Sequence, residues 1–132
     1  MAKGKSRGEP ELMPAHKHLI IRAEVNHPPM TEKYIRLWLR KLVKKIDMNI
    51  IKGPYASYVN KEGNRGVTGV VMIETSHIAI HVWDEERPAL VQCDVYSCAE
   101  FSSNEVLAEF IPFDVVKIDS MLLDRASKIS LL

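Results

Sequence analysis

The chain has 132 residues, of which 46% are hydrophobic and 27% are charged, with a formal net charge of +1 at pH 7. This composition is typical of one compact domain and excludes a fibrous or low-complexity chain. No apolar run approaches the roughly 20 residues that cross a bilayer, and residues 1–17 lack the apolar stretch of a secretory signal. We therefore expect no membrane partner, and the balanced charge predicts no nucleic-acid partner.

The charges are unevenly distributed along the chain. Residues 31–48 carry a local charge of +4, whereas residues 84–109 carry −6. Two oppositely charged solvated faces are the simplest interpretation, although a cationic substrate or a self-complementary dimer could also use them.

The two cysteines predict free thiols. Cys93 and Cys98 are five residues apart, which places them on opposite faces of a strand, so a disulfide between them is not expected. This usage fits a reducing cytoplasm, where a thiol is either a small buried hydrophobe or a working acid or nucleophile. We expect Cys93 to be buried.

The first part of the chain predicts an arm, a strand and a helix. Residues 1–17 mix charges, glycine and proline and predict a flexible arm, and residues 18–132 a single domain. A strand is expected over residues 19–25, ending before Pro28. Thr31 then caps a helix whose apolar stripe recurs at helical spacing as far as Ile46.

The remainder predicts a sheet. Strands are expected over residues 50–59, 67–74, 77–83 and 90–96, followed by a short helix capped by Ser102 and a final strand over residues 113–118. This order predicts an α+β fold, a two-layer sandwich of a mostly antiparallel sheet with helices packed on one face.

The densest group of chemically reactive side chains lies between Glu74 and Glu85. An ordinary strand with histidines on its polar face would explain the pattern without any function. Metal binding is not predicted, because His77 and His81 would lie about 13 Å apart in a strand. No nucleophile elbow or phosphate-binding glycine loop occurs in the sequence.

Three segments nevertheless resemble one family. They are Gly66-Val67-Thr68-Gly69-Val70-Val71, Glu74-Thr75-Ser76-His77-Ile78-Ala79-Ile80-His81-Val82-Trp83-Asp84-Glu85, and Asp94-Val95-Tyr96-Ser97-Cys98. In this order they resemble the prokaryotic S-adenosylmethionine decarboxylase proenzymes, over about residues 18–120. The resemblance implies self-cleavage between Thr75 and Ser76, which gives a β chain of residues 1–75 and an α chain of residues 76–132. Ser76 then becomes a covalent pyruvoyl group, the only cofactor implied.

The resemblance also implies roles for individual side chains in cleavage and turnover. His81 matches the acid or base that assists processing, and Thr68 matches the hydroxyl residue beside it. Cys98 matches the proton donor that acts on the substrate carbon after carbon dioxide leaves, although a buried core thiol is its simpler interpretation.

Substrate binding and partners follow from the same resemblance. Trp83 and Glu85 match positions near the ligand, where an aromatic face can meet a sulfonium or adenine and a carboxylate can bind ribose hydroxyls. The pyruvoyl carbonyl would form a Schiff base with the substrate amine and act as an electron sink. The product would supply the aminopropyl donor for spermidine synthesis. A homodimer of cleaved protomers in the cytoplasm is expected.

Two departures from the family pattern keep alternatives open. Thr75 stands where the family has glutamate, and residues 60–65 lack the aromatic side chain that stacks on adenine, for which Tyr55 and Tyr58 are candidate replacements. One alternative is a pyruvoyl-dependent decarboxylase of ornithine or arginine, attracted by the acidic residues 84–86. Another is an uncleaved homologue that binds a ligand or regulates a partner.

Overall fold

The computed structural model describes residues 15–132, so the arm expected over residues 1–17 lies almost entirely outside the described part. No helix within residues 15–132 has both the length and the apolar character of a membrane span. The elements are, in chain order, β1 (Lys17–Val25), α1 (Glu32–Lys45), β2 (Ile50–Val59), β3 (Gly66–Ile73), β4 (Ser76–Trp83), β5 (Ala89–Ser97), α2 (Ser103–Ala108), the 3₁₀ turn η2 (Ile111–Phe113), β6 (Val115–Asp124) and β7 (Ser130–Leu131).

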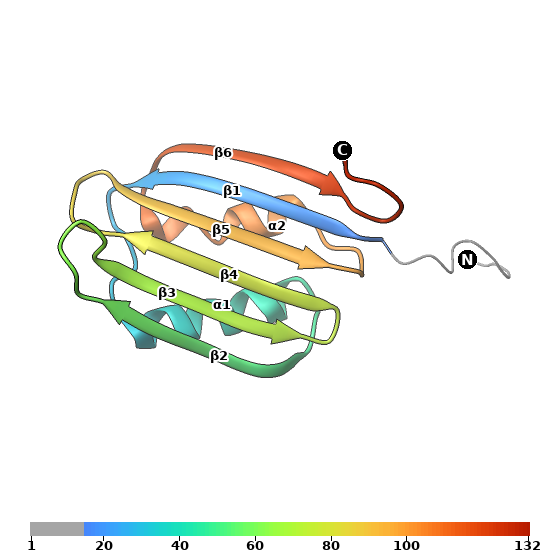
Figure 1. Cartoon of the computed structure of the whole chain (residues 1–132), viewed down its shortest axis with the longest axis horizontal. Coiled ribbons are helices and arrows are strands. Elements are labelled where there is room, and N and C mark those ends of the chain that lie inside the picture. Colours follow the sequence, from blue (N-terminus) through green and yellow to red (C-terminus); the bar gives the residue numbers. More distant parts are fainter. Residues whose placement is uncertain (1–14) are drawn as a thin grey trace, which may run out of the picture.

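One antiparallel sheet runs through the described chain. Its strand order is β2-β3-β4-β5-β1-β6-β7, and each neighbouring pair is antiparallel. Both helices lie behind this sheet in Figure 1, so within residues 15–132 they cover one face and leave the other without a helix. The predicted two-layer α+β fold is confirmed.

Helix α1 forms where its sequence predicts it. The Thr31 hydroxyl accepts a hydrogen bond from the Tyr34 N–H at 3.1 Å, and Glu32 lies at the positive end of the helix dipole. The apolar stripe of the helix is buried against the sheet. At Gly69 on β3, a Cβ atom would lie 2.2 Å from Cγ2 of Ile35, so only glycine allows this close approach.

The alternation along β4 defines the two faces of the sheet. Ile78 and Ile80 are completely buried on the helix side, whereas His77 and His81 lie on the uncovered face. We call this second surface the open face. It also carries Val70 and Met72 of β3, both of which are exposed.

The end of the chain differs from the sequence prediction. The final strand was expected over residues 113–118, but Phe113 belongs to a 3₁₀ turn and is buried against Trp38 and Phe110. Asp114 then turns the chain with a φ of 54°, and β6 continues to Asp124 because it pairs with β1 along the whole of that strand. Strand β7 was not predicted, since two residues carry no periodic signal.

Candidate active site

The turn between β3 and β4 holds the predicted cleavage bond. Ile73 pairs with Ser76, so Glu74 and Thr75 form a two-residue connection. Ser76 has a φ of 153°, a conformation that side-chain-bearing residues rarely adopt and that costs roughly 1–3 kcal/mol. The backbone is therefore strained at the residue that follows the Thr75–Ser76 bond.

Two neighbouring loops form hydrogen bonds with this turn. The Cys98 N–H donates to the carbonyl oxygen of Thr75 at 2.9 Å, which is the carbonyl of the predicted cleavage bond. On the other side, the Glu74 N–H donates to the Asn49 carbonyl oxygen at 3.0 Å, and the Asn49 amide donates to the Glu74 carboxylate at 3.0 Å. The Thr75 carbonyl is thus polarised by the Cys98 N–H, and the turn that carries it is held by hydrogen bonds on both sides.

The Thr75 side chain is also held. It donates to the Met48 sulfur at 3.0 Å and accepts from the Ser97 hydroxyl at 2.9 Å. Ser97 is completely buried, and its oxygen accepts the Ala99 N–H at 3.0 Å. Sequence reasoning identified Thr75, Ser76 and Cys98 but missed Met48, Asn49 and Ser97, because an ordinary methionine, asparagine or serine gives no signal of a contact distant in the sequence.

Thr68 and His81 form a pair on the open face. They are direct partners across β3 and β4, and the Thr68 hydroxyl lies 3.2 Å from Nδ1 of His81. The structure brings these two predicted residues together as expected. However, His81 lies five positions after Ser76 along β4, about 16 Å away, so the pair does not reach the cleavage bond of the same chain.

His77, which directly follows Ser76, belongs to a polar group on the open face. Its Nε2 lies 3.6 Å from a carboxylate oxygen of Asp94, and Nε2 of His18 lies 3.5 Å from the same oxygen. Beside them the Arg125 guanidinium stacks 4.2 Å above the Tyr96 ring. The open face is therefore polar and ionisable close to the Ser76 end of β4.

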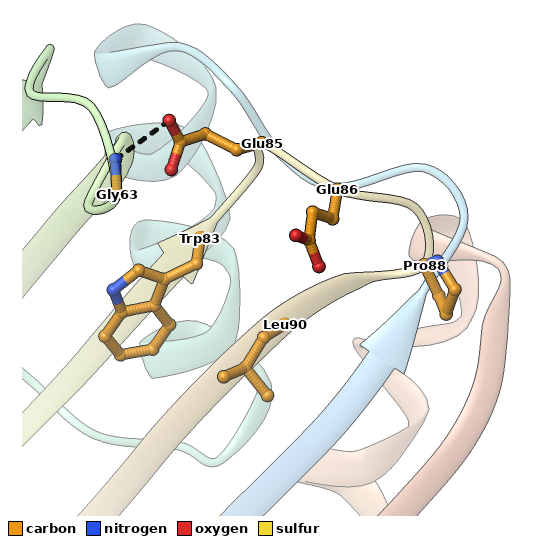
Figure 2. A pocket seen from close by; sticks show the side chains of 6 residues that line it. All are labelled: Gly63, Trp83, Glu85, Glu86, Pro88 and Leu90. Atoms are coloured by element: carbon orange, nitrogen blue, oxygen red, sulfur yellow. Dashed lines mark hydrogen bonds between the residues drawn. The ribbon is translucent and has the colours of Figure 1, made fainter.

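Trp83 and Glu85 lie at the opposite end of β4 from Ser76, about 23 Å along the strand. They line a cavity of about 320 Å³ together with Gly63, Glu86, Pro88 and Leu90. Figure 2 shows the Trp83 ring beside Leu90, with Glu85 reaching away toward Gly63. Within one chain, this cavity and the cleavage turn are separate regions.

Glu85 is held by the loop that precedes β3. Its carboxylate accepts the Gly63 N–H at 3.0 Å and the Arg65 guanidinium at 2.8 Å. The Gly63 bond, and after it the bonds and charge of Arg65, hold the pKa of the Glu85 carboxyl below its ordinary value. The indole N–H of Trp83 donates to the Asn64 side chain at 2.8 Å. Both side chains are therefore fixed before any ligand arrives.

Comparison with known proteins places this arrangement in a family. A family model described as S-adenosylmethionine decarboxylase matches residues 22–126. The chain belongs to the S-adenosylmethionine decarboxylase family. The family resemblance predicted from the three sequence segments is confirmed.

Individual relatives agree with this assignment. A protein of Clostridium botulinum (strain Langeland) named S-adenosylmethionine decarboxylase proenzyme is 32% identical over 94 residues, 68% of this chain and 76% of the relative. One of the same name from Pyrococcus horikoshii is 41% identical over 56 residues, 42% of this chain and 39% of the relative. The crystal structure of the adenosylmethionine decarboxylase from Aquifex aeolicus has a TM-score of 0.66 at 25% identity, covering 89% of this chain and 93% of that chain.

The acidic stretch of this family member offers fewer free carboxylates than the sequence indicates. Asp84 is buried and accepts a hydrogen bond from the Tyr58 hydroxyl at 2.9 Å, a bond that raises the pKa of Tyr58. Glu85 is paired with Arg65. Of the two aromatic candidates for stacking on adenine, Tyr58 is therefore engaged by Asp84, whereas Tyr55 is exposed on the edge strand.

The two cysteines differ in environment. Cys93 is buried as expected, and desolvation, followed by the nearby charge of Asp94, raises the pKa of its thiol far above the ordinary value. Cys98 is partly exposed in the loop that bonds to Thr75, and both thiols are free. Of the two, only Cys98 is placed beside the cleavage turn.

Proposed function

We propose that this chain is a self-cleaving, pyruvoyl-dependent decarboxylase that acts on S-adenosylmethionine. The observation that carries the proposal is the 2.9 Å hydrogen bond from the Cys98 N–H to the Thr75 carbonyl, immediately before a strained Ser76, in a member of this family. Cleavage between Thr75 and Ser76 leaves a β chain of residues 1–75 and an α chain of residues 76–132.

The cleavage steps follow from the residues of the turn. The Ser76 hydroxyl oxygen attacks the Thr75 carbonyl carbon, so that a C–O bond forms, the peptide C–N bond breaks and Ser76 gains a free amine. Negative charge grows on the Thr75 carbonyl oxygen during this attack, and the Cys98 N–H is already positioned to stabilise it. Strain at Ser76 raises the energy of the peptide relative to the ester that replaces it.

Elimination then completes the cleavage. A base removes the Cα proton of Ser76, and the ester oxygen leaves with Thr75 as its new carboxylate. The dehydroalanine left on the α chain becomes an imine, which water hydrolyses to a ketone with release of ammonia. In turnover, the resulting pyruvoyl group supplies an electron sink for the carbanion left after carbon dioxide departs.

We further propose a homodimer formed through the open face. Apolar side chains are exposed on this face, namely Ile20, Val70, Met72 and Met121. Because the Thr68–His81 pair lies about 16 Å from Ser76 of its own chain, it would act on Ser76 of a second copy. A two-fold axis through the open face can bring the Trp83 end of one β4 toward the Ser76 end of the other.

Roles in turnover are proposed for three side chains. Cys98 lies on the loop whose N–H bonds to Thr75, and its partly exposed thiol is the group proposed to return a proton to the substrate carbon. Trp83 offers an aromatic face to a sulfonium, and Glu85 offers a fixed carboxylate to ribose hydroxyls. Because Cys98 must remain a thiol for this role, we propose a cytoplasmic location, and the product would serve as the aminopropyl donor for spermidine synthesis.

The intact mass of the purified protein under denaturing conditions tests the proposal. We expect two fragments, with the 57-residue α chain lighter by the mass of ammonia than a fragment that begins with serine. Ser76→Ala should remain a single chain of 15.0 kDa, because it lacks the nucleophile. A wild-type chain that never splits would contradict the proposal and favour an uncleaved binding protein.

Substrate choice needs a second assay. Release of carbon dioxide from S-adenosylmethionine, ornithine and arginine should be compared on the cleaved protein. We expect turnover of S-adenosylmethionine alone, since Tyr58 engages Asp84, and Arg65 offsets the charge of Glu85 that would attract a basic amino acid. Turnover of ornithine or arginine would instead support the alternative substrate class.

A further inference from the structure

Two hydroxyl groups beside the cleavage bond are not consumed by the proposed chemistry. They belong to Thr75, whose carbonyl is attacked, and to Ser97, which is completely buried at the end of β5. Ser97 pairs with Ser76 across β4 and β5, so it is a direct strand neighbour of the residue that carries the nucleophile.

The donors and acceptors of this group run in one direction. The Ala99 N–H donates to the Ser97 oxygen at 3.0 Å, the Ser97 hydroxyl donates to the Thr75 hydroxyl oxygen at 2.9 Å, and Thr75 donates to the Met48 sulfur at 3.0 Å. The Ser97 hydroxyl also lies 3.4 Å from the Met48 sulfur, so the nearer Thr75 oxygen and this sulfur share its single proton.

Ser97 joins the two halves of the contact that polarises the cleavage bond. Ser97 bonds to the side chain of Thr75, which supplies the carbonyl oxygen. It also accepts the N–H of Ala99, the residue that follows Cys98, and Cys98 supplies the N–H that bonds to this carbonyl. We infer that Ser97 is a positioning residue for self-cleavage, which keeps the Thr75 carbonyl aligned with the Cys98 N–H. This inference rests on the proposed function.

The expected size of the effect follows from the geometry. A displacement of about 1 Å at a reacting group can cost about 100-fold in rate, and one oxyanion donor contributes a similar factor. In Ser97→Ala the Thr75 side chain and the Ala99 N–H both lose a partner, but the Cys98 N–H itself is retained. We therefore expect cleavage of Ser97→Ala to be about 10–100-fold slower than that of the wild-type chain.

The experiment follows cleavage of freshly synthesised chain by intact mass, with and without hydroxylamine. Hydroxylamine breaks an ester but not a peptide bond, so the fragment it produces measures how much chain has completed the acyl shift. A positioning role lowers this fraction in Ser97→Ala. Ser97→Thr, which keeps the hydroxyl, should restore most of the cleavage rate.

A matched control separates positioning from loss of stability. Val95→Ala truncates a completely buried side chain two residues earlier on β5. It should destabilise the fold more than Ser97→Ala yet cleave at close to the wild-type rate.

If Ser97→Ala does not fold, Thr75→Val provides the second variant. It removes the acceptor of the Ser97 bond while keeping a similar shape, and it should also slow cleavage.

The outcomes distinguish the inference from the function on which it rests. If the wild-type chain cleaves while Ser97→Ala cleaves equally fast, or while Val95→Ala is slowed as much, the positioning role is wrong and the proposed function stands. Failure of the wild-type chain to cleave would overturn both. Slow cleavage of Ser97→Ala with rescue by Ser97→Thr supports both.

Discussion

Gly66, the first residue of β3, lies beside the Trp83 end of β4, and Ser76 begins β4 at the other end; both residues have a φ of 153°. At position 66 only glycine fits, because a Cβ atom there would lie 1.7 Å from the Val82 carbonyl oxygen. Ser76 adopts the same φ with a side chain present. Beside one end of β4, glycine on β3 adopts this φ without strain, whereas at the other end Ser76 keeps the strain next to the bond proposed to break.

The hydrogen-bonding groups at the two ends of β4 also differ in their burial. Around Ser76 they come largely from backbone groups and from the buried Ser97. Around Trp83 the central acceptor is the Glu85 carboxylate, which is accessible to water and is held by the Gly63 N–H and by the Arg65 side chain. The first arrangement suits bond cleavage, which needs rigid alignment, and the second suits reversible binding of a ligand.

The largest effect is expected for Cys98→Ala, which separates the role of the backbone N–H from that of the thiol. Cys98→Ala keeps the N–H that bonds to Thr75 but loses the thiol, so self-cleavage should persist while turnover falls about 10²–10⁴-fold, the usual contribution of a general acid. Intact mass measures the first quantity and release of carbon dioxide the second. If cleavage and turnover were lost together, Cys98 would not have two separable roles.

A somewhat smaller effect is expected for His81→Ala. Without the acid or base, cleavage should slow about 100-fold, although Ser76 and its turn are unchanged. The proposed dimer sharpens this test, because the His81 that matters would belong to the second copy.

Mixed dimers decide between the two locations of His81. When Ser76→Ala and His81→Ala chains with different tags are coexpressed, one site of each mixed dimer contains both residues. The His81→Ala chain should then be cleaved faster than when it is expressed alone. An unchanged rate in confirmed mixed dimers would show that His81 acts within its own chain or not at all.

The sheet and the helix that covers it could be predicted from the sequence. The inward alternation of Ile78 and Ile80, and the apolar stripe of α1, require burial on one side, so the sheet and its covering helix followed from periodicity. Thr68 and His81 were expected together from the family resemblance alone, and the register of β3 and β4 makes them direct partners.

The cleavage turn could be predicted only in part. Ser76 is recognisable from its motif, but the Cys98 N–H and the φ of Ser76 are backbone properties that no residue type displays. The loop containing Met48 and Asn49 reaches the turn only through tertiary packing. Where function depends on backbone geometry, residue identity alone carries little of the information.

A stability effect of about 1 kcal/mol should reveal the strain at Ser76. Ser76→Ala retains a Cβ atom at a φ of 153°, whereas Ser76→Gly relieves it. The relief, roughly 1–3 kcal/mol, exceeds the entropy cost of glycine, so the glycine variant should be the more stable of the two by about 1 kcal/mol. Urea denaturation at equal protein concentration measures the difference. A more stable alanine variant would argue against strain at this position.

The smallest expected effect lies at the Trp83 end and depends on pH. The folded-state pKa of Glu85 is lowered, chiefly by the Gly63 N–H and then by Arg65, so its stabilising contribution is present above the ordinary value of 4.5 and is lost as pH falls through the lowered folded value. The Gly63 amide should therefore be protected from hydrogen exchange at neutral pH and lose protection only below pH 4.5.

Glu85→Gln should weaken this pH dependence, whereas Glu86→Gln should preserve it. The change should be small, because Arg65 and Glu85 both remain accessible to water. Identical pH profiles in wild type and Glu85→Gln would mean that another group holds the loop beside the Trp83 cavity.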